Sequence, residues 1–258
     1  MVKVRDIEKI MEELAPQGIK EPWDNVGLQI GGRDNILSGI LLALDLTDEV
    51  ISEAEALDCN MIITHHPLIF APLKRITEEE PEGRLAIKLI KKGINFIAAH
   101  TNLDKAEGGV NDCLAERLGL IDVTFLGGED GEAIARIGTL PEAMSLKDFA
   151  IFCKDALGAS GVRYSGAEGK RIKTVALCSG AGSDLFTEAC ENGADAFVTG
   201  EVKHHHALYG AAAGISFVEA GHFETENIVL EAVADALENK IDIPVHISEA
   251  HKPVLKMI

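Results

Sequence analysis

The sequence Asn60-Met61-Ile62-Ile63-Thr64-His65-His66-Pro67 contains a short apolar run that ends in two histidines and a proline. Apolar, β-branched runs of four to eight residues predict strands, and proline ends a strand because it has no N–H group. A similar run, 40–44, precedes this one, and another, 94–99, follows it. Helical patterns over 48–57 and 81–92 separate the three runs. This order predicts an α/β fold with largely parallel strands.

The second half of the chain repeats the same order. It has predicted strands over 174–178, 194–199 and 215–219, and predicted helices over 184–192 and 205–213. Residues 93–100, Gly-Ile-Asn-Phe-Ile-Ala-Ala-His, match 214–222, Gly-Ile-Ser-Phe-Val-Glu-Ala-Gly-His, with one inserted residue. Residues 58–64 match 193–199 in the same way. We therefore predict two duplicated α/β repeats.

Glycine-rich and charged segments at 127–132 and 166–171 surround a further predicted strand, 133–139, and a helix, 146–157. We place the boundary between the repeats after Gly127. The predicted domains are thus 1–127 and 128–258.

The composition is typical of a globular protein. The chain has 258 residues, 47% hydrophobic and 26% charged, so we expect a packed core and exclude disordered and disulfide-scaffold classes. It carries 24 Lys and Arg against 42 Asp and Glu, a formal net charge of −18. An acidic surface repels phosphate backbones, and no basic cluster exceeds two residues, so nucleic acid is disfavoured as a partner.

Nothing in the sequence predicts a membrane or export segment. The apolar runs fall far short of the ~20 residues that a membrane helix requires. Residues 1–14 have apolar positions at helical spacing rather than a signal-peptide core. The five cysteines are scattered without a C-x-x-C pair, which favours reduced thiols used as core residues. We therefore expect a cytoplasmic protein.

Most of the nine histidines lie at the ends of predicted strands. In open α/β sheets, binding residues collect beyond the carboxyl ends of the strands. Asp104 follows His100 by four residues, and Glu226 follows His222 by four, so each pair shares one face if its segment is helical. Imidazole and carboxylate ligands suit Zn, Mn, Fe or Co, and the sequence leaves the choice of metal open.

His65 and His66 present a geometric difficulty, because adjacent residues of a strand point to opposite faces. Either Pro67 ends the strand and lets both side chains reach one ion, or each histidine binds a different ion. Two ions about 3.5–4 Å apart, bridged by a carboxylate, would use both histidines and explain the two acids. We predict a dinuclear centre.

Other polar residues carry less information. The run His204-His205-His206 occupies the place that the repeat assigns to the first histidine pair, and it is either an exposed helix start or a contributor to the outer part of the site. We expect His246 and His251 to have no specific partner, and Asp45 to be a turn residue rather than a ligand. The glycine-containing loop 180–185 is a weak candidate for holding an anion.

Five motifs resemble those of one known family. They are Trp23-Asp24-Asn25-Val26-Gly27-Leu28-Gln29-Ile30-Gly31, Thr64-His65-His66-Pro67-Leu68-Ile69-Phe70, His100-Thr101-Asn102-Leu103-Asp104, Thr199-Gly200-Glu201-Val202-Lys203-His204-His205 and Gly221-His222-Phe223-Glu224-Thr225-Glu226. Together they span nearly the whole chain and resemble the Ngg-interacting factor three-like family, whose members are often labelled GTP cyclohydrolase I type 2 homologues.

The resemblance implies two duplicated, intertwined α/β domains, a dinuclear metal site in the cleft between them, and a homohexameric ring. It makes five residues the ligands of two divalent ions per subunit: His65, His66, Asp104, His222 and Glu226. His100 would then be an outer partner or proton carrier. The resemblance certifies no substrate.

The leading functional hypothesis is a metal-dependent hydrolase acting on a small molecule, including nucleotides and other phosphorylated compounds. Paired divalent ions lower the pKa of water toward ~7, and His100 or one of the histidines at 204–206 would move the proton. The alternative is a non-catalytic metal-binding scaffold or adaptor. No nucleophile elbow, zincin or P-loop motif is present, so the mechanisms that those motifs support have no basis in the sequence.

Overall fold

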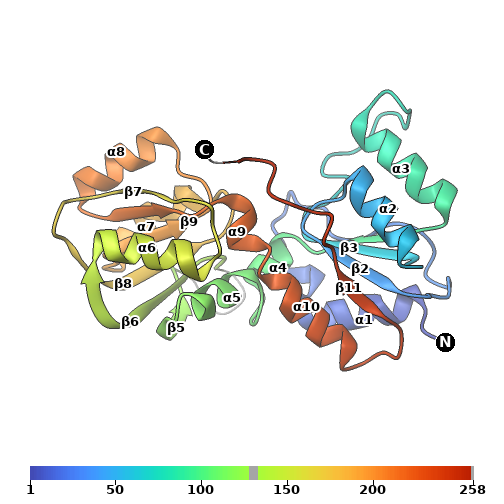
Figure 1. Ribbon diagram of the computed structural model, residues 1–258, viewed down its shortest axis with the longest axis horizontal. Coiled ribbons are helices and arrows are strands. Elements are labelled where there is room, and N and C mark those ends of the chain that lie inside the picture. Colours follow the sequence, from blue (N-terminus) through green and yellow to red (C-terminus); the bar gives the residue numbers. More distant parts are fainter. Residues whose placement is uncertain (128–132, 257–258) are drawn as a thin grey trace. The chain divides into compact units, whose positions relative to one another are not determined.

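The computed structural model describes residues 1–127 and 133–256 (Figure 1). The chain forms two compact units, each with its own mixed sheet. Unit 1 contains Met1–Ala106 and Leu230–Lys252, and unit 2 contains Glu107–Val229 with the residues from Pro253 onward. The chain thus leaves unit 1 once and returns to it near the C-terminus, which gives the intertwined connection that the family resemblance implies. The predicted boundary after Gly127 adjoins residues 128–132, which lie outside the described part of the chain.

The sheet of unit 1 has the strand order β1-β4-β3-β2-β11. The strands are β1 (Gly27–Ile30), β2 (Ile40–Ala43), β3 (Met61–Thr64), β4 (Asn95–Ala98) and β11 (Val245–Ile247). Strands β2, β3, β4 and β11 are parallel, and β1 pairs with β4 in the antiparallel sense. All four residues of each of β2, β3 and β4 are buried, as expected for a parallel sheet covered on both faces.

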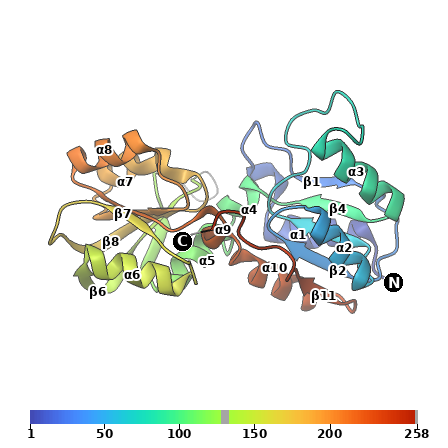
Figure 2. The ribbon, with the colours of Figure 1, turned by 45° about the horizontal axis from the view of Figure 1, so that its top comes forward.

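Helices cover both faces of this sheet. They are α1 (Val4–Leu14), α2 (Asp48–Ala56), α3 (Pro81–Lys92), α4 (Thr101–Lys105) and α10 (Val229–Glu238), with the short 3₁₀ helix η1 (Gln17–Ile19). In Figure 1, α2 and α3 lie above the strands of unit 1, whereas α1 and α10 lie below them, and Figure 2 shows α3 beside β1 and β4. Thr47 caps α2 by accepting a hydrogen bond from the Val50 N–H, and Gly93 ends α3 in the left-handed conformation.

The sheet of unit 2 has the order β5-β6-β8-β9-β10-β7. The strands are β5 (Ile121–Phe125), β6 (Arg136–Ser145), β7 (Arg163–Ser165), β8 (Arg171–Cys178), β9 (Ala196–Thr199) and β10 (Ser216–Glu219). Strands β8, β9 and β10 are parallel, and the other pairings are antiparallel. The helices are α5 (Val110–Arg117), α6 (Leu146–Ala156), α7 (Phe186–Glu191), α8 (His204–Ala213) and α9 (His222–Glu226), with the 3₁₀ helix η2 (Gly182–Leu185).

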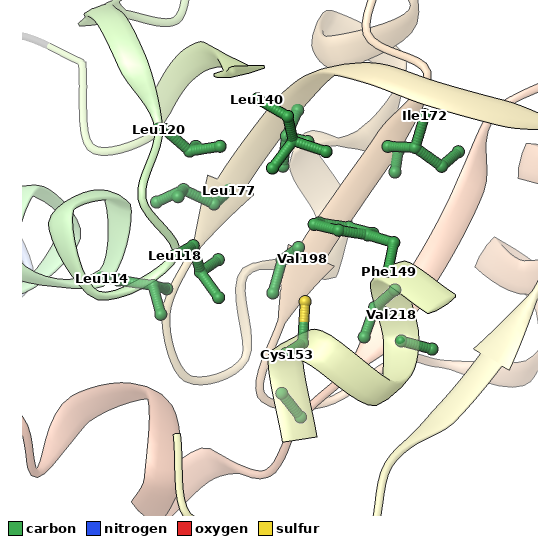
Figure 3. Close-up of a cluster of buried hydrophobic side chains, with 14 of the residues drawn as sticks. Leu114, Leu118, Leu120, Leu140, Phe149, Cys153, Ile172, Leu177, Val198 and Val218 are labelled. Atoms are coloured by element: carbon green, nitrogen blue, oxygen red, sulfur yellow. The ribbon is translucent and has the colours of Figure 1, made fainter. Parts of the chain in front are cut away.

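The main core of unit 2 forms where α5 and α6 pack on the sheet (Figure 3). Phe149 of α6 is fully buried against strand residues that include Val198 and Val218. Replacing such an aromatic side chain by alanine typically costs about 3–5 kcal/mol of stability. This core fixes the carboxyl ends of the parallel strands, from which α9 begins.

The two sheets share one arrangement of four strands, which confirms the predicted duplication. The order β1-β4-β3-β2 in unit 1 corresponds to β7-β10-β9-β8 in unit 2, and in both the first strand is antiparallel to the second. Gly93 and Gly214 end corresponding helices in the left-handed conformation. The predicted parallel strands are therefore present in both repeats. The short edge strands β1, β7 and β11 were not predicted, because three or four half-exposed residues give little periodic signal.

None of the helices in 1–127 and 133–256 is long and apolar enough to cross a bilayer.

Candidate metal-binding site

His65 is the first residue beyond β3, which ends at Thr64. The Thr64 hydroxyl donates to the carbonyl oxygen of His66 at 2.6 Å, so the chain turns here. His65 is 1% exposed, and its Nδ1 lies 2.8 Å from the carbonyl oxygen of Ala99. A carbonyl only accepts hydrogen bonds, so Nδ1 donates and the lone pair of the neutral ring is on Nε2. This Nε2 lies 3.6 Å from Oδ1 of Asp104.

His66 is held by a carboxylate that follows β2. Its Nδ1 lies 2.7 Å from Oδ1 of Asp45, and the other oxygen of Asp45 lies 3.0 Å from Nε2 of His251. Burial raises the pKa of Asp45, but the hydrogen bonds from His251 and His66 outweigh it and hold the pKa well below its usual range. Asp45 therefore stays ionised and fixes the ring of His66.

His100 precedes α4 and is held in the same way. Its Nδ1 lies 2.9 Å from Oδ1 of Asp24, whose Oδ2 accepts hydrogen bonds from the backbone N–H and the hydroxyl of Thr101. Burial raises the pKa of Asp24, but the hydrogen bonds from His100 and Thr101 outweigh it and keep the pKa well below its usual range. Asp24 thus connects the loop before β1 to the start of α4.

The three histidines of unit 1 form one cluster. The ring centroids lie 5.0 Å apart for His65 and His66, 5.2 Å for His65 and His100, and 5.6 Å for His66 and His100. One ring nitrogen of each lies within 4.8 Å of a ring nitrogen of the other two. The alternation of strand side chains does not separate His65 from His66, because β3 ends before both of them.

Unit 2 holds the second set of predicted ligands on α9, the one-turn helix labelled in Figure 1. Nε2 of His222 lies 3.0 Å from Oε2 of Glu226, so the predicted spacing of four residues does bring the pair together. Nδ1 of His222 lies 2.8 Å from Oε1 of Glu201. Glu226 is only 4% exposed, although a carboxylate is costly to bury without a compensating charge.

Two glycines let the backbone pass directly beside this pair. A Cβ on Gly180, which has φ +56°, would lie 2.1 Å from Oε1 of Glu226 and 3.3 Å from Nε2 of His222. A Cβ on Gly200 would lie 2.7 Å from Cα of His222. The N–H of Gly180 donates to the Thr225 hydroxyl at 3.1 Å, which ties the loop after β8 to α9.

All four of these imidazoles share one arrangement. Nδ1 is paired with the Ala99 carbonyl in His65, with Asp45 in His66, with Asp24 in His100 and with Glu201 in His222. Histidines that bind a metal through Nε2 characteristically have the opposite nitrogen held by a carboxylate or carbonyl, which fixes the tautomer and the ring orientation. The donor set of imidazoles and buried carboxylates therefore fits a divalent transition metal.

Comparison with known proteins identifies the family of this chain. The family model described as Duf34/NIF3 (NGG1p interacting factor 3) matches residues 2–253. The chain belongs to the Duf34/NIF3 family. A Clostridium perfringens relative named "GTP cyclohydrolase 1 type 2 homolog" is 38% identical over 246 residues, which cover 93% of each chain. A Lactococcus lactis relative with the same name is 32% identical, over 97% of each chain.

Solved structures of the NIF3 family have the same fold. The Staphylococcus aureus hypothetical protein SA1388 is 30% identical and superposes with a TM-score of 0.93, over 99% of each chain. A Bacillus cereus protein described as related to NIF3 is 26% identical with a TM-score of 0.92, covering 100% of this chain and 99% of its own. The fold of this NIF3 chain is thus the one that the sequence motifs implied.

The histidine run of α8 has a local role in this NIF3 chain. The ring of His206 is buried, with Nδ1 3.0 Å from the Ser183 hydroxyl and Nε2 3.3 Å from Asp184. Burial lowers the pKa of His206, which favours the neutral ring. His204 and His205 are exposed at the start of the helix. His206 therefore packs α8 onto η2, within the loop that was the weak anion candidate.

Three of the cysteines are poor candidates for nucleophiles. Burial raises the pKa of the Cys59 and Cys113 thiols to about 11, so both are protonated at neutral pH. Cys153 is fully buried in the core of unit 2. Cys59 and Cys153 are buried in the two cores, as expected, whereas Cys113 is only partly buried.

Four residues support the histidines, directly or through a carboxylate, and were not predicted to do so from the sequence. His251 does have a partner, so the expectation that it has none was wrong. Asp45 lies in the bend after β2, as expected of a turn residue, but it also holds the ring of His66. Asp45 follows a parallel strand at the same sheet edge as His66, and that position could have revealed it. Asp24 and Glu201 lie in quoted motifs but gave no sign of their partners, because loops bring them to the histidines from 76 and 21 residues away.

Proposed function

We propose that this protein is a metal-dependent hydrolase of small molecules, with nucleotides and other phosphorylated compounds as the substrate class. His65, His66, Asp104, His222 and Glu226 would hold two divalent ions per chain. The name "GTP cyclohydrolase 1 type 2 homolog" carried by the relatives is consistent with hydrolysis of a nucleotide. The metal would be Fe, Zn, Mn or Co, which all accept imidazole and carboxylate ligands.

The observation that carries the proposal is the common orientation of the four imidazoles. Each has Nδ1 paired with a carbonyl or carboxylate oxygen within 2.9 Å. His100 and His222 stand at corresponding points of the two repeats, and in both the Nδ1 atom is paired with a carboxylate. The pairing leaves Nε2 as the ligand or proton-carrying atom in each ring.

The two acids fit the role of bridging ligands. Asp104 and Glu226 are 6% and 4% exposed, and each lies near Nε2 of a histidine that we assign as a ligand. A bound cation would supply the positive charge that makes two buried carboxylates favourable. A carboxylate has two oxygens, so it can contact two ions at once.

When bound, a pair of divalent ions lowers the pKa of water and polarises the bond to be broken. His100 lies in the histidine cluster, and we assign it to proton transfer rather than to ligation. Asp24 remains ionised and accepts a hydrogen bond from Nδ1–H of His100, which leaves Nε2 as the atom that can take up or release a proton.

The test is metal analysis of Asp104→Ala and Glu226→Ala, with Asp235→Ala, an exposed acid of α10, as the control. The protein is purified without an affinity tag, so that the tag brings no metal. We expect two ions per chain in the parent and the control, and loss of both ions in each of the other variants. A metabolite screen with the metal restored then measures hydrolysis, which His100→Gln should lower about 10²–10⁴-fold without removing metal.

Wild-type metal content in both Asp104→Ala and Glu226→Ala would refute the ligand assignment. Loss of only one ion in each would refute the assignment of Asp104 and Glu226 as bridging ligands. Full metal content with no turnover on any metabolite would instead support the alternative, a metal-binding scaffold or adaptor.

We also propose that the protein is a cytoplasmic homohexamer. The five scattered cysteines, with no C-x-x-C pair, are consistent with a reducing compartment, and the hexamer rests on the family resemblance alone. Light scattering should give a mass six times that of one chain, and a monomer or dimer mass would contradict it.

A further inference from the structure

Two large aromatic side chains are exposed beside the histidine cluster of unit 1. Trp23 is 58% exposed and Phe70 is 54% exposed, although such rings normally contribute most when buried. Their ring centroids lie 5.6 Å apart at an interplanar angle of 51°. The pair therefore presents open ring surface to the solvent.

Hydrogen bonds hold the two aromatic segments together. The side-chain amide of Asn25 donates to the carbonyl oxygen of Ile69 at 2.5 Å. Gln29 accepts from the N–H of Ile69 at 2.8 Å and donates to the carbonyl oxygen of Asn25, also at 2.8 Å. These bonds fix the segment before Phe70 against the segment after Trp23. A ligand that contacts both rings would therefore lose little free energy in ordering them.

The aromatic pair adjoins the groups that we assign to chemistry. The ring of His100 lies 6.2 Å from the ring of Trp23 and 6.3 Å from that of Phe70, edge-on to both. The same ring lies 5.2 Å from His65. A molecule of nucleoside size is therefore long enough to reach the histidines with one end and the two aromatic rings with the other.

The charges around the pair favour a neutral ligand surface. Asp24 is paired with His100, and Glu21 is paired with Lys105 at 2.7 Å, so neither acid is available to attract a cation to the rings. Nucleobases and similar planar heteroaromatic rings all stack on aromatic side chains, because each of them has a π face.

We propose that Trp23 and Phe70 form a stacking site for a neutral, planar heteroaromatic ring of the substrate. This inference rests on the proposed function, since it names the part of the substrate that lies away from the hydrolysed group. It adds a specificity requirement: a compound with the reactive group but without a planar ring binds poorly.

The chain reports on this site directly, because Trp23 is its single tryptophan. Guanosine and adenosine are titrated into metal-loaded and metal-free protein while tryptophan fluorescence is followed, with ribose as the non-planar control. We expect saturable quenching by both nucleosides and none by ribose. Metal-free protein should still bind the nucleosides, because the rings and not the ions make the contact.

Variants separate stacking from unspecific effects. Phe70→Ala should weaken nucleoside binding by about 5- to 150-fold, the range found when one stacked aromatic is removed. Tyr209→Ala, which removes an aromatic ring that is 61% exposed on α8, should leave it unchanged. Variants of Trp23 lack the fluorescent reporter, so their nucleoside binding is measured by equilibrium dialysis. Trp23→Ala should bind nucleosides weakly, and Trp23→Phe should restore most of the affinity.

Absence of quenching, or an equal loss of affinity in Phe70→Ala and Tyr209→Ala, would overturn the inference. So would a change of oligomeric mass in Phe70→Ala with unchanged nucleoside affinity, because the rings would then be a subunit contact. Metal content is measured on the same samples. A protein that binds nucleosides but no metal would refute the proposed function and leave the stacking site standing, whereas metal without stacking would do the opposite.

Discussion

Replacing Gly180 by alanine tests the packing of the ligand pair on α9. The added Cβ would lie 2.1 Å from Oε1 of Glu226 and 3.3 Å from Nε2 of His222. Gly193 provides a matched control in the same unit, because it also has positive φ, +75°, but its Cβ would meet nothing within 4 Å. The difference between the two variants isolates the contact with the ligands.

The expected magnitudes follow from this geometry. A left-handed alanine costs about 1–2 kcal/mol, so both variants should lose stability, with a fall in Tm of about 2–8 °C. In Gly180→Ala the carboxylate of Glu226 must also move by about 1.3 Å to change a 2.1 Å contact into an ordinary one of 3.4 Å. Metal-ligand distances tolerate about 0.2 Å, so we expect metal affinity to fall by at least about 10–100-fold.

The assay combines thermal unfolding with metal titration of both variants and the parent. Gly193→Ala should melt lower but bind metal as the parent does, whereas Gly180→Ala should melt lower and bind metal poorly. Parental metal affinity in Gly180→Ala would refute the placement of His222 and Glu226 as ligands. An equal loss of metal affinity in Gly193→Ala would show that general destabilisation, rather than the contact, is the cause.

Three further predictions concern the surroundings of the site. His251→Ala should weaken metal binding by about 10–100-fold, because it removes a partner of Asp45, the carboxylate that holds His66. Metal titration checks this, with His246→Ala as the control. The folded state lowers the pKa of Glu53, because hydrogen bonds from the C-terminal segment outweigh burial. Its contribution is therefore present above the unfolded pKa and lost in acid, so from pH about 6 to about 3 the parent should lose more stability than Glu53→Gln in denaturant titrations. Asp112→Ala should lower the unfolding free energy by about 3–5 kcal/mol, measured by urea unfolding, because it removes the carboxylate paired with the buried Arg136.

The parallel strands and their helices could be predicted because they follow local rules. Buried parallel strands have continuous apolar runs, and the bounds of α3 agree with the prediction from Pro81 and the glycine at 93. Helix α1 could be predicted from apolar positions at helical spacing. The edge strands, the one-turn helices α4 and α9 and the return of α10 to unit 1 were not predicted, because long-range packing rather than local pattern stabilises them.

The predicted ligand residues followed from spacing, whereas their supports did not. Histidine and carboxylate four residues apart share a helical face, and this relation is written in the sequence for His222 and Glu226. The partners Asp24 and Asp45 lie 76 and 21 residues from the histidines that they hold. No local pattern encodes such a pairing.

The sequence by itself determined the repeated α/β order and the residues able to bind metal, because strand and helix periods and ligand chemistry are local properties. Only the tertiary structure decided which nitrogen of each imidazole is held and which is available to a ligand. It also decided that Gly180 must lack a side chain and that Trp23 and Phe70 stand beside His100. Those properties depend on distances between distant parts of the chain, which are fixed only when the sheets and their loops pack.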